Sequence, residues 1–118
     1  MAIAVGSTRQ SLANSYAALG NWLGAATGNP GTTTTPANEV TGGSPAYARG
    51  QTTWSAGSNG VSNGTATTLN SPAATITYVI LASAATTGAA NQLDNCAITS
   101  VVLSGQGQIV ITPTYTQT

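Results

Sequence analysis

The sequence has almost no charged residues. Of its 118 residues, two are basic and two are acidic, and the net charge at pH 7 is zero. An ordinary soluble domain is about 25% charged, and net charge normally keeps soluble monomers apart. We therefore expect the chain to work packed in an assembly, as a homo-oligomer or together with other subunits.

Histidine and lysine are absent, and their absence excludes most catalytic machinery. A Ser-His-Asp or Cys-His arrangement needs histidine, and Schiff-base chemistry, Ser-Lys chemistry and the phosphate-binding P-loop need lysine. One cysteine without histidine gives no zinc site. The two carboxylates, Glu39 and Asp94, are expected to pair with an arginine or to cap a turn. We expect no enzyme, no catalytic residues, no metal and no cofactor.

Several partners and locations are also disfavoured. Two arginines make no basic patch, so nucleic-acid binding is not expected. The longest apolar stretch, residues 78–82, is far below the roughly 20 residues that span a bilayer. Residues 1–6 lack the basic and apolar regions of a signal peptide. Cys96 cannot form an internal disulfide, and we expect a small buried residue there, in a chain folded in a reducing cytosol.

One helix is expected near the N-terminus. Ser7 and Gln10 have the spacing of a capping box, and Gly20 is expected to end the helix in the left-handed conformation. Leu12, Tyr16, Leu19 and Leu23 recur at helical spacing and form one stripe of core candidates, of which Leu23 lies beyond Gly20.

The remainder of the chain predicts short strands separated by turns. The expected strands are 22–26, 46–54, 61–69, 75–83, 92–97, 98–104 and 108–115. Asn59-Gly60 and Asn63-Gly64 each predict a tight turn, and Pro113 predicts an edge strand or a strand end. This pattern indicates one mainly β domain, an antiparallel β-sandwich or barrel-like fold with one short helix. Its parts are an arm (1–6), the helix (7–20) and the β domain (22–118).

Glu39 and Arg49 flank the turn at residues 42–45. Two interpretations remain open. They form an ion pair that clamps the loop to the sheet, or they are solvated side chains that each hold a loop backbone group. An exposed pair would contribute only about 0–1 kcal/mol.

Residues 26–54, ATGNPGTTTTPANEVTGGSPAYARGQTTW, resemble a family of small virion proteins of phages that infect actinobacteria, labelled minor tail or tail-fibre-like. Ala26 replaces the usual histidine and Asn29 the usual acid, and Pro45-Ala46 lengthens the turn before Tyr47. The pattern is turn chemistry, which indicates a fold signature. The residues expected to form this loop motif are Gly28, Pro30, Gly31, Glu39, Gly42, Gly43, Tyr47, Arg49 and Trp54.

The resemblance implies a virion component, assembled in the cytoplasm of a bacterial host. The first interpretation is a capsid decoration or minor capsid protein, in many copies, that stabilises the head shell by binding the major capsid protein. The alternative is a minor tail or tail-fibre component involved in host recognition. A weaker alternative is a carbohydrate-binding module that uses Tyr47, Trp54, Trp22 and Tyr78.

Three segments are candidates for contacts with other subunits. They are the N-terminal arm, a threonine-rich loop and the C-terminal strand, whose edge could pair with a neighbour's strand. The candidate contact residues are Thr32, Thr33, Thr34, Thr35, Thr114 and Tyr115.

Overall fold

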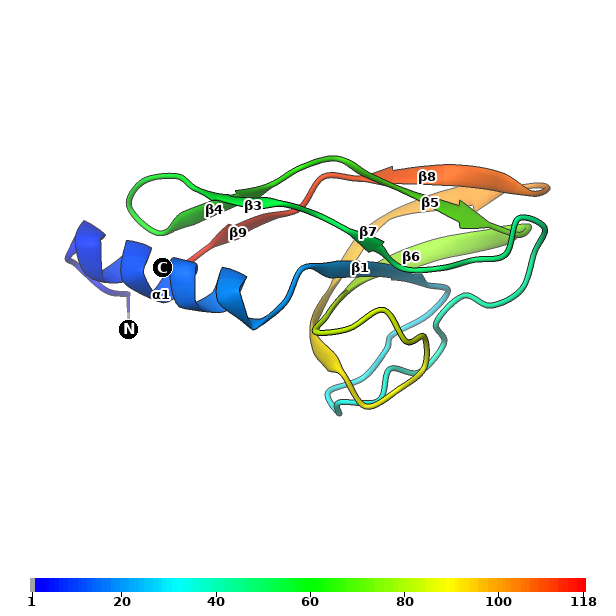
Figure 1. Cartoon of the computed structure of the whole chain (residues 1–118), viewed down its shortest axis with the longest axis horizontal. Coiled ribbons are helices and arrows are strands. Elements are labelled where there is room, and N and C mark those ends of the chain that lie inside the picture. The colour runs from blue at the N-terminus through cyan, green and yellow to red at the C-terminus, as the bar shows by residue number, and fades with distance from the viewer. Residues whose placement is uncertain (1) are drawn as a thin grey trace.

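The computed structural model describes residues 2–118, which fold into one helix followed by nine strands (Figure 1). Met1, the first residue of the expected arm, lies outside the described residues. The elements are α1 (Gly6–Leu19), β1 (Trp22–Ala26), β2 (Gly50–Gln51), β3 (Trp54–Ala56), β4 (Val61–Gly64), β5 (Thr67–Ser71), β6 (Ala74–Ala82), β7 (Gln92–Leu103), β8 (Gly107–Ile111) and β9 (Thr114–Thr116). The predicted class, mainly β and antiparallel with one N-terminal helix, is confirmed.

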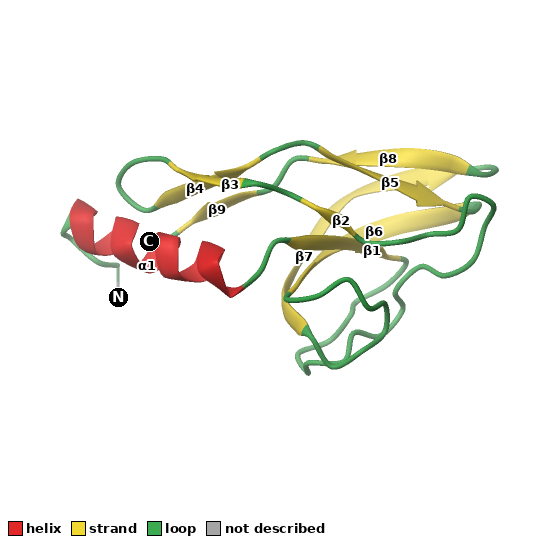
Figure 2. Ribbon diagram, in the orientation of Figure 1, coloured by secondary structure: helices red, strands yellow, loops and turns green. Residues whose placement is uncertain are grey.

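The strands form three antiparallel sheets in an elongated molecule of 47 × 25 × 23 Å. Four strands lie in the order β2-β1-β6-β7, three in the order β3-β4-β9, and β5 pairs with β8. Figure 2 shows α1 beside the three-stranded sheet at one end and the β5–β8 pair over β6 at the other. The loops at 27–41 and 83–91 lie together beneath β1 and β6 (Figure 1).

The core lies where the β5–β8 pair covers the four-stranded sheet. Alternate residues of β5 are buried, so that Leu69 faces inward and meets its cross-strand partner Ile109. The buried residues of this cluster are Ala25, Val40, Tyr47, Leu69, Ile76 and Ile109. The period-2 pattern of β-branched and leucine residues therefore fixes which faces of the two layers meet.

The helix ends as predicted but begins differently. It stops at Leu19 and leaves Trp22–Ala26 as a strand. The expected capping box is wrong, because Val5 is the N-cap and no side chain caps the helix. The side chain of Gln10 bonds instead to the turn after β3, accepting from the Gly60 N–H at 3.0 Å. The expected left-handed cap is also wrong, since Gly20 is extended with φ 174°.

The turn predictions have mixed outcomes. The turn at Asn59-Gly60 is confirmed, with φ of 58° and 104° at its two residues. The turn at Asn63-Gly64 is wrong, because both residues lie in β4. The expected strand 61–69 instead breaks after Gly64, whose N–H donates to the Pro113 carbonyl at 2.8 Å.

Three other strand predictions need correction. Within the segment 46–54, β2 takes Gly50–Gln51, and the last residue begins β3, Trp54–Ala56. Thr52, between these strands, turns inward and donates to the Thr65 carbonyl at 2.8 Å. The two strands expected at 92–104 are one, since nothing in 92–103 is glycine or proline. The last expected strand breaks into β8 and β9 around Pro113, which cannot donate to a ladder.

Several residues expected inside lie at the surface. Leu12 and Leu19 of the helical stripe are 43% and 59% exposed, because α1 packs on the three-stranded sheet through the smaller Ala13. The prediction that Cys96 is buried is wrong, because its position on the outermost strand of the sheet leaves it exposed.

The core assignment predicts a large difference between two leucines. Leu69 is 1% exposed, whereas Leu19 is 59% exposed. Leu69→Ala is expected to lower the free energy of unfolding by about 3 kcal/mol, and Leu19→Ala by less than about 1 kcal/mol. Urea denaturation followed by tryptophan fluorescence measures both. Equal effects would contradict the described core.

Candidate functional site

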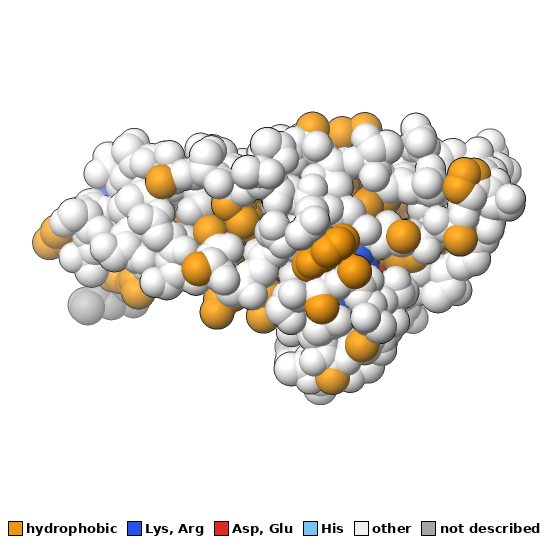
Figure 3. All heavy atoms as spheres, in the orientation of Figure 1, with side chains coloured by type: hydrophobic (Ala, Val, Ile, Leu, Met, Phe, Trp, Pro, Cys, Tyr) orange, Lys and Arg blue, Asp and Glu red, His pale blue; other side chains and the backbone are white. Residues whose placement is uncertain are grey.

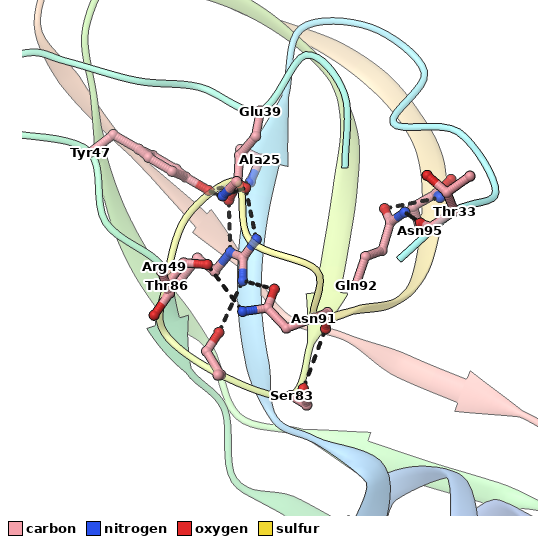
Figure 4. A network of polar contacts seen from close by, with 12 residues as sticks. Ala25, Thr33, Glu39, Tyr47, Arg49, Ser83, Thr86, Asn91, Gln92 and Asn95 are labelled. Carbon is pink, nitrogen blue, oxygen red and sulfur yellow. Dashed lines mark hydrogen bonds and ion pairs between the residues drawn. The ribbon is translucent and has the colours of Figure 1, made fainter. Parts of the chain in front are cut away.

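A buried ion pair joins Glu39 to Arg49 (Figure 4). The contact has two parallel hydrogen bonds, from Arg49 Nη2 to Glu39 Oε1 and from Arg49 Nε to Glu39 Oε2, both of 2.8 Å. The Arg49 side chain is 0% exposed and the Glu39 side chain is 3% exposed. Of the two interpretations that the sequence left open, the structure therefore supports the ion-pair clamp. A bidentate arginine–carboxylate contact is among the strongest polar contacts in proteins.

Further hydrogen bonds extend the pair into a network. The Tyr47 hydroxyl donates to Glu39 Oε2 at 2.8 Å and accepts from the Ala25 N–H at 3.0 Å. Arg49 Nη1 donates to the Ala84 carbonyl at 3.0 Å and to Asn91 Oδ1 at 2.6 Å. The network connects β1, the segment before β2 and the loop between β6 and β7, as Figure 4 shows.

The far side of the loop between β6 and β7 also reaches the carboxylate. The Gly88 N–H donates to Glu39 Oε1 at 3.0 Å. Among residues 2–118, no buried side-chain nitrogen or oxygen lacks a hydrogen-bond partner. The buried charges are thus fully compensated, which burial of an ion pair requires.

Gly24 in β1 makes room for the network. A Cβ atom at this position would lie 2.7 Å from the Tyr47 hydroxyl and 2.9 Å from Glu39 Oε2. Any larger residue would push these groups away from the sheet. The glycine is therefore needed for a close approach of side chains to the strand backbone.

The network shifts the pKa values of its titratable groups. Burial by itself raises the pKa of Glu39, but hydrogen bonds from Arg49, Tyr47 and Gly88 and the charge of Arg49 outweigh it and lower the pKa. Burial, followed by the charge of Glu39, raises the pKa of Tyr47. The carboxylate is thus charged and the tyrosine neutral at neutral pH.

The structure brings together only part of the predicted loop motif. Glu39, Tyr47 and Arg49 meet in the network, but Trp54 lies elsewhere. The Trp54 indole donates to the Gly20 carbonyl at 3.0 Å. The remaining motif residues shape the loops around the network. Gly31, Gly42 and Gly43 adopt positive φ, Pro30 is buried, and Gly28 lies against Asn38.

The threonine-rich loop is fixed through its backbone and exposes its side chains. The Gln92 side chain donates to the Thr33 carbonyl at 2.7 Å, and the Asn95 side chain donates to the Gly31 carbonyl at 2.9 Å. Thr32, Thr33, Thr34 and Thr35 are all exposed. The loop and the start of β7 line an open hollow of about 530 Å³ that is rich in hydroxyl and amide groups.

A second, mostly apolar groove of about 350 Å³ lies between the inner face of the four-stranded sheet and the C-terminal strand. The rings of Tyr16 and Tyr115 stack there with centroids 3.6 Å apart, and Trp54 meets Tyr16 edge-on. Sequence reasoning missed this cluster, because no spacing rule relates residue 16 to residue 115. Tyr115, expected to contact partners, is half-buried in this cluster, whereas Thr114 is exposed.

All four charged side chains are engaged within the chain. Arg9 donates to the carbonyls of Ile3, Ala4 and Asn59. Asp94 accepts from the Tyr16 hydroxyl at 2.8 Å. Figure 3 shows a surface with almost no charged atoms and with scattered apolar patches. The surface is therefore as poor in charged groups as the sequence.

No group of three acidic, histidine or cysteine residues within residues 2–118 is placed to hold a metal ion. Across the same residues, no helix has the length and apolar character needed to span a membrane.

Comparison with protein families identifies the class of this chain as a structural component of phage virions, of the fibre type. The matching family model is described as Podophage GP4 fiber I protein gp80 and covers residues 9–112. The chain belongs to this family. The match supports the expected virion component, but not the particular actinobacteriophage pattern. Comparison with curated proteins and with solved structures gives no match.

The network predicts that Glu39→Gln is strongly destabilising. The amide would leave the Arg49 guanidinium buried without a compensating charge, which costs about 3–5 kcal/mol of unfolding free energy. Asp94→Asn is the matched control, because Asp94 is exposed and the oxygen of the new side-chain amide can still accept from the Tyr16 hydroxyl. The control should lose less than about 1 kcal/mol. Equal losses in chemical denaturation would argue against the clamp.

The lowered pKa of Glu39 predicts an acid-sensitive fold. The unfolded chain binds the proton at the ordinary pKa of 4.5, whereas the folded chain binds it only at lower pH. The stabilisation is therefore complete above this pH and is lost as the pH falls through the folded-state pKa. The melting temperature of the natural chain should fall steeply below about pH 4.5, and the melting temperature of Glu39→Gln should fall less steeply. Parallel pH profiles would show that Glu39 is not the responsible group.

Proposed function

We propose that this chain is a non-enzymatic subunit of a phage tail fibre and contributes to contacts with the host surface. The observation that carries the proposal is the fibre-family match over residues 9–112. The match covers most of the helix, the ion-pair network and every strand except β9, so it concerns most of the fold.

The family match favours the tail-fibre alternative over the capsid-decoration interpretation. The decoration interpretation rested on small size and an uncharged surface. An uncharged surface would equally suit a fibre subunit that contacts neighbouring subunits. We propose other virion subunits, including copies of this chain, as its partners, and no nucleic acid.

The state of the reactive groups supports a structural role. Glu39 is occupied by Arg49, and Asp94 accepts from Tyr16. Although Cys96 is exposed as a residue, partial burial of its thiol, with the charge of Asp94 as a second cause, raises the pKa of the thiol. A thiol with a raised pKa is a weak nucleophile at neutral pH.

The threonine-rich loop is our candidate for the host contact. Its backbone is fixed by Gln92 and Asn95, so its exposed hydroxyls are presented in a defined arrangement. The aromatic residues of the carbohydrate-module interpretation give less support. Tyr47 is buried in the network, and Trp54 is half-buried and meets Tyr16 edge-on, so these two rings are less accessible to a sugar than that interpretation requires.

The proposal is tested by quantitative mass spectrometry of full virions, separated tails and tail-less heads. We expect a few copies per particle, recovered with the tails. Phages that lack the chain should also adsorb to host cells more slowly. Near-stoichiometric recovery with the heads would overturn the proposal and favour capsid decoration.

A further inference from the structure

We propose that the free edge of β7, residues Cys96–Leu103, joins this chain to a second copy of itself. The need for a second copy rests on the proposed function, because one copy is 47 Å long and a fibre extends beyond a single subunit. The surface itself is argued from the hydrogen bonds, exposure and charge of β7.

The main chain of this segment has an open side. β7 is the last strand in the order β2-β1-β6-β7, and it is the longest strand of the described chain, with 12 residues. Its first residue is covered, because the Gln92 N–H donates to the Thr34 carbonyl at 2.8 Å. From Cys96 onward, within residues 2–118, its only main-chain partner is β6. An edge of this kind is a template for another strand.

A change of register adds unpaired main chain in the middle of the edge. Tyr78 of β6 pairs with Ala97, whereas Ile76 pairs with Val101, so residues 98–100 have no assigned partner in β6. These residues lie at the surface or half-buried. The peptide groups of these residues that point away from β6 are, like those of the rest of the edge, without a main-chain partner within residues 2–118.

The edge lacks most of the features that normally prevent pairing between edges. Natural edge strands are protected by lysine, proline, inward-pointing charges or β-bulges. Residues 96–103, CAITSVVL, contain no lysine, proline or charge, and the one such feature is the irregularity at residues 98–100. Val101 and Val102 are 39% and 70% exposed. Valine favours strands whose side chains are packed against a neighbour.

A second copy fits this edge because identical uncharged edges are complementary. Two copies related by a two-fold axis place the strands antiparallel, and each supplies the donors and acceptors that the other needs. No charged residue lies within 96–103 to oppose the approach, and the exposed Asp94 lies two residues before this segment. The apolar groove beside the edge, lined in part by Cys96 and Ile98, would be closed by the incoming strand.

The C-terminal strand is a less suitable edge. β9 is an edge strand, as expected from the sequence, and among residues 2–118 it pairs with β4, but it has three residues. Its Tyr115 is committed to the stack with Tyr16. A contact through β7 can form more hydrogen bonds and bury more apolar surface.

Sedimentation velocity of the 118-residue chain over a concentration series tests the contact. We expect reversible self-association, weakened at least about ten-fold by Val102→Lys, because a lysine on an edge strand opposes its pairing with another strand. Leu19→Lys is the matched control, since Leu19 is a similarly exposed apolar residue on α1, and it should leave association unchanged. Circular dichroism verifies that each variant is folded, and Thr99→Lys replaces Val102→Lys if that variant is not.

The outcomes separate this contact from the proposed function. A monomer at all concentrations, or equal effects of the β7 and α1 lysines, would overturn the contact. Recovery of the chain with virion tails would then leave the proposed function standing. Association through β7, in a chain that is recovered with virion heads, would support the contact and overturn the proposed function.

Cross-linking gives a second readout that does not depend on weakened binding. In a Cys96→Ser background, Ser100→Cys lies near the middle of the free edge, so mild oxidation should give a disulfide-linked dimer. Ser11→Cys, exposed on α1, is the control and should stay monomeric. Equal dimer yields from the two cysteines would contradict pairing through β7.

Discussion

The rest of the structure depends on the ion pair between Glu39 and Arg49. Long segments of this chain, notably 27–49 and 83–91, lack regular secondary structure and have few apolar residues to bury. The pair fixes both segments against β1 through hydrogen bonds to Tyr47, Ala84, Gly88 and Asn91. Since its two charges are buried, the pair is stable only while every partner is in place. The loops therefore behave as parts of one cooperative unit with the sheet.

The same arrangement determines the character of the surface. Two of the four charged side chains are inside the network, so the surface of residues 2–118 has mainly hydroxyl, amide and apolar groups. Such a surface is a poor one for an isolated monomer and a suitable one for contacts between subunits, which then need few ions to be desolvated. The exposed edge of β7 and the groove beside it have this character.

The sequence predicted the fold class, the strand at 75–83 and the turn at Asn59-Gly60, because these depend on local patterns of β-branched residues and on positive φ. It could not predict the long-range arrangement. Cys96 was expected to be buried, since nothing local reveals that β7 is an outermost strand. Gln10 was expected to cap its own helix, but its partners are 50 residues away. Of the site, the pairing of Glu39 with Arg49 was one of two open interpretations, whereas the stack of Tyr16 on Tyr115 carried no sequence signal.

The central claim is that a neutral, self-pairing subunit of this kind belongs to the phage fibre. A cryo-electron microscopy reconstruction of the virion, at a resolution that traces strands, tests it most directly. The account predicts density for this chain within a tail fibre, with β7 of one copy beside β7 of another. Copies arrayed over the capsid lattice, or fibre density in which every β7 edge faces solvent, would contradict it.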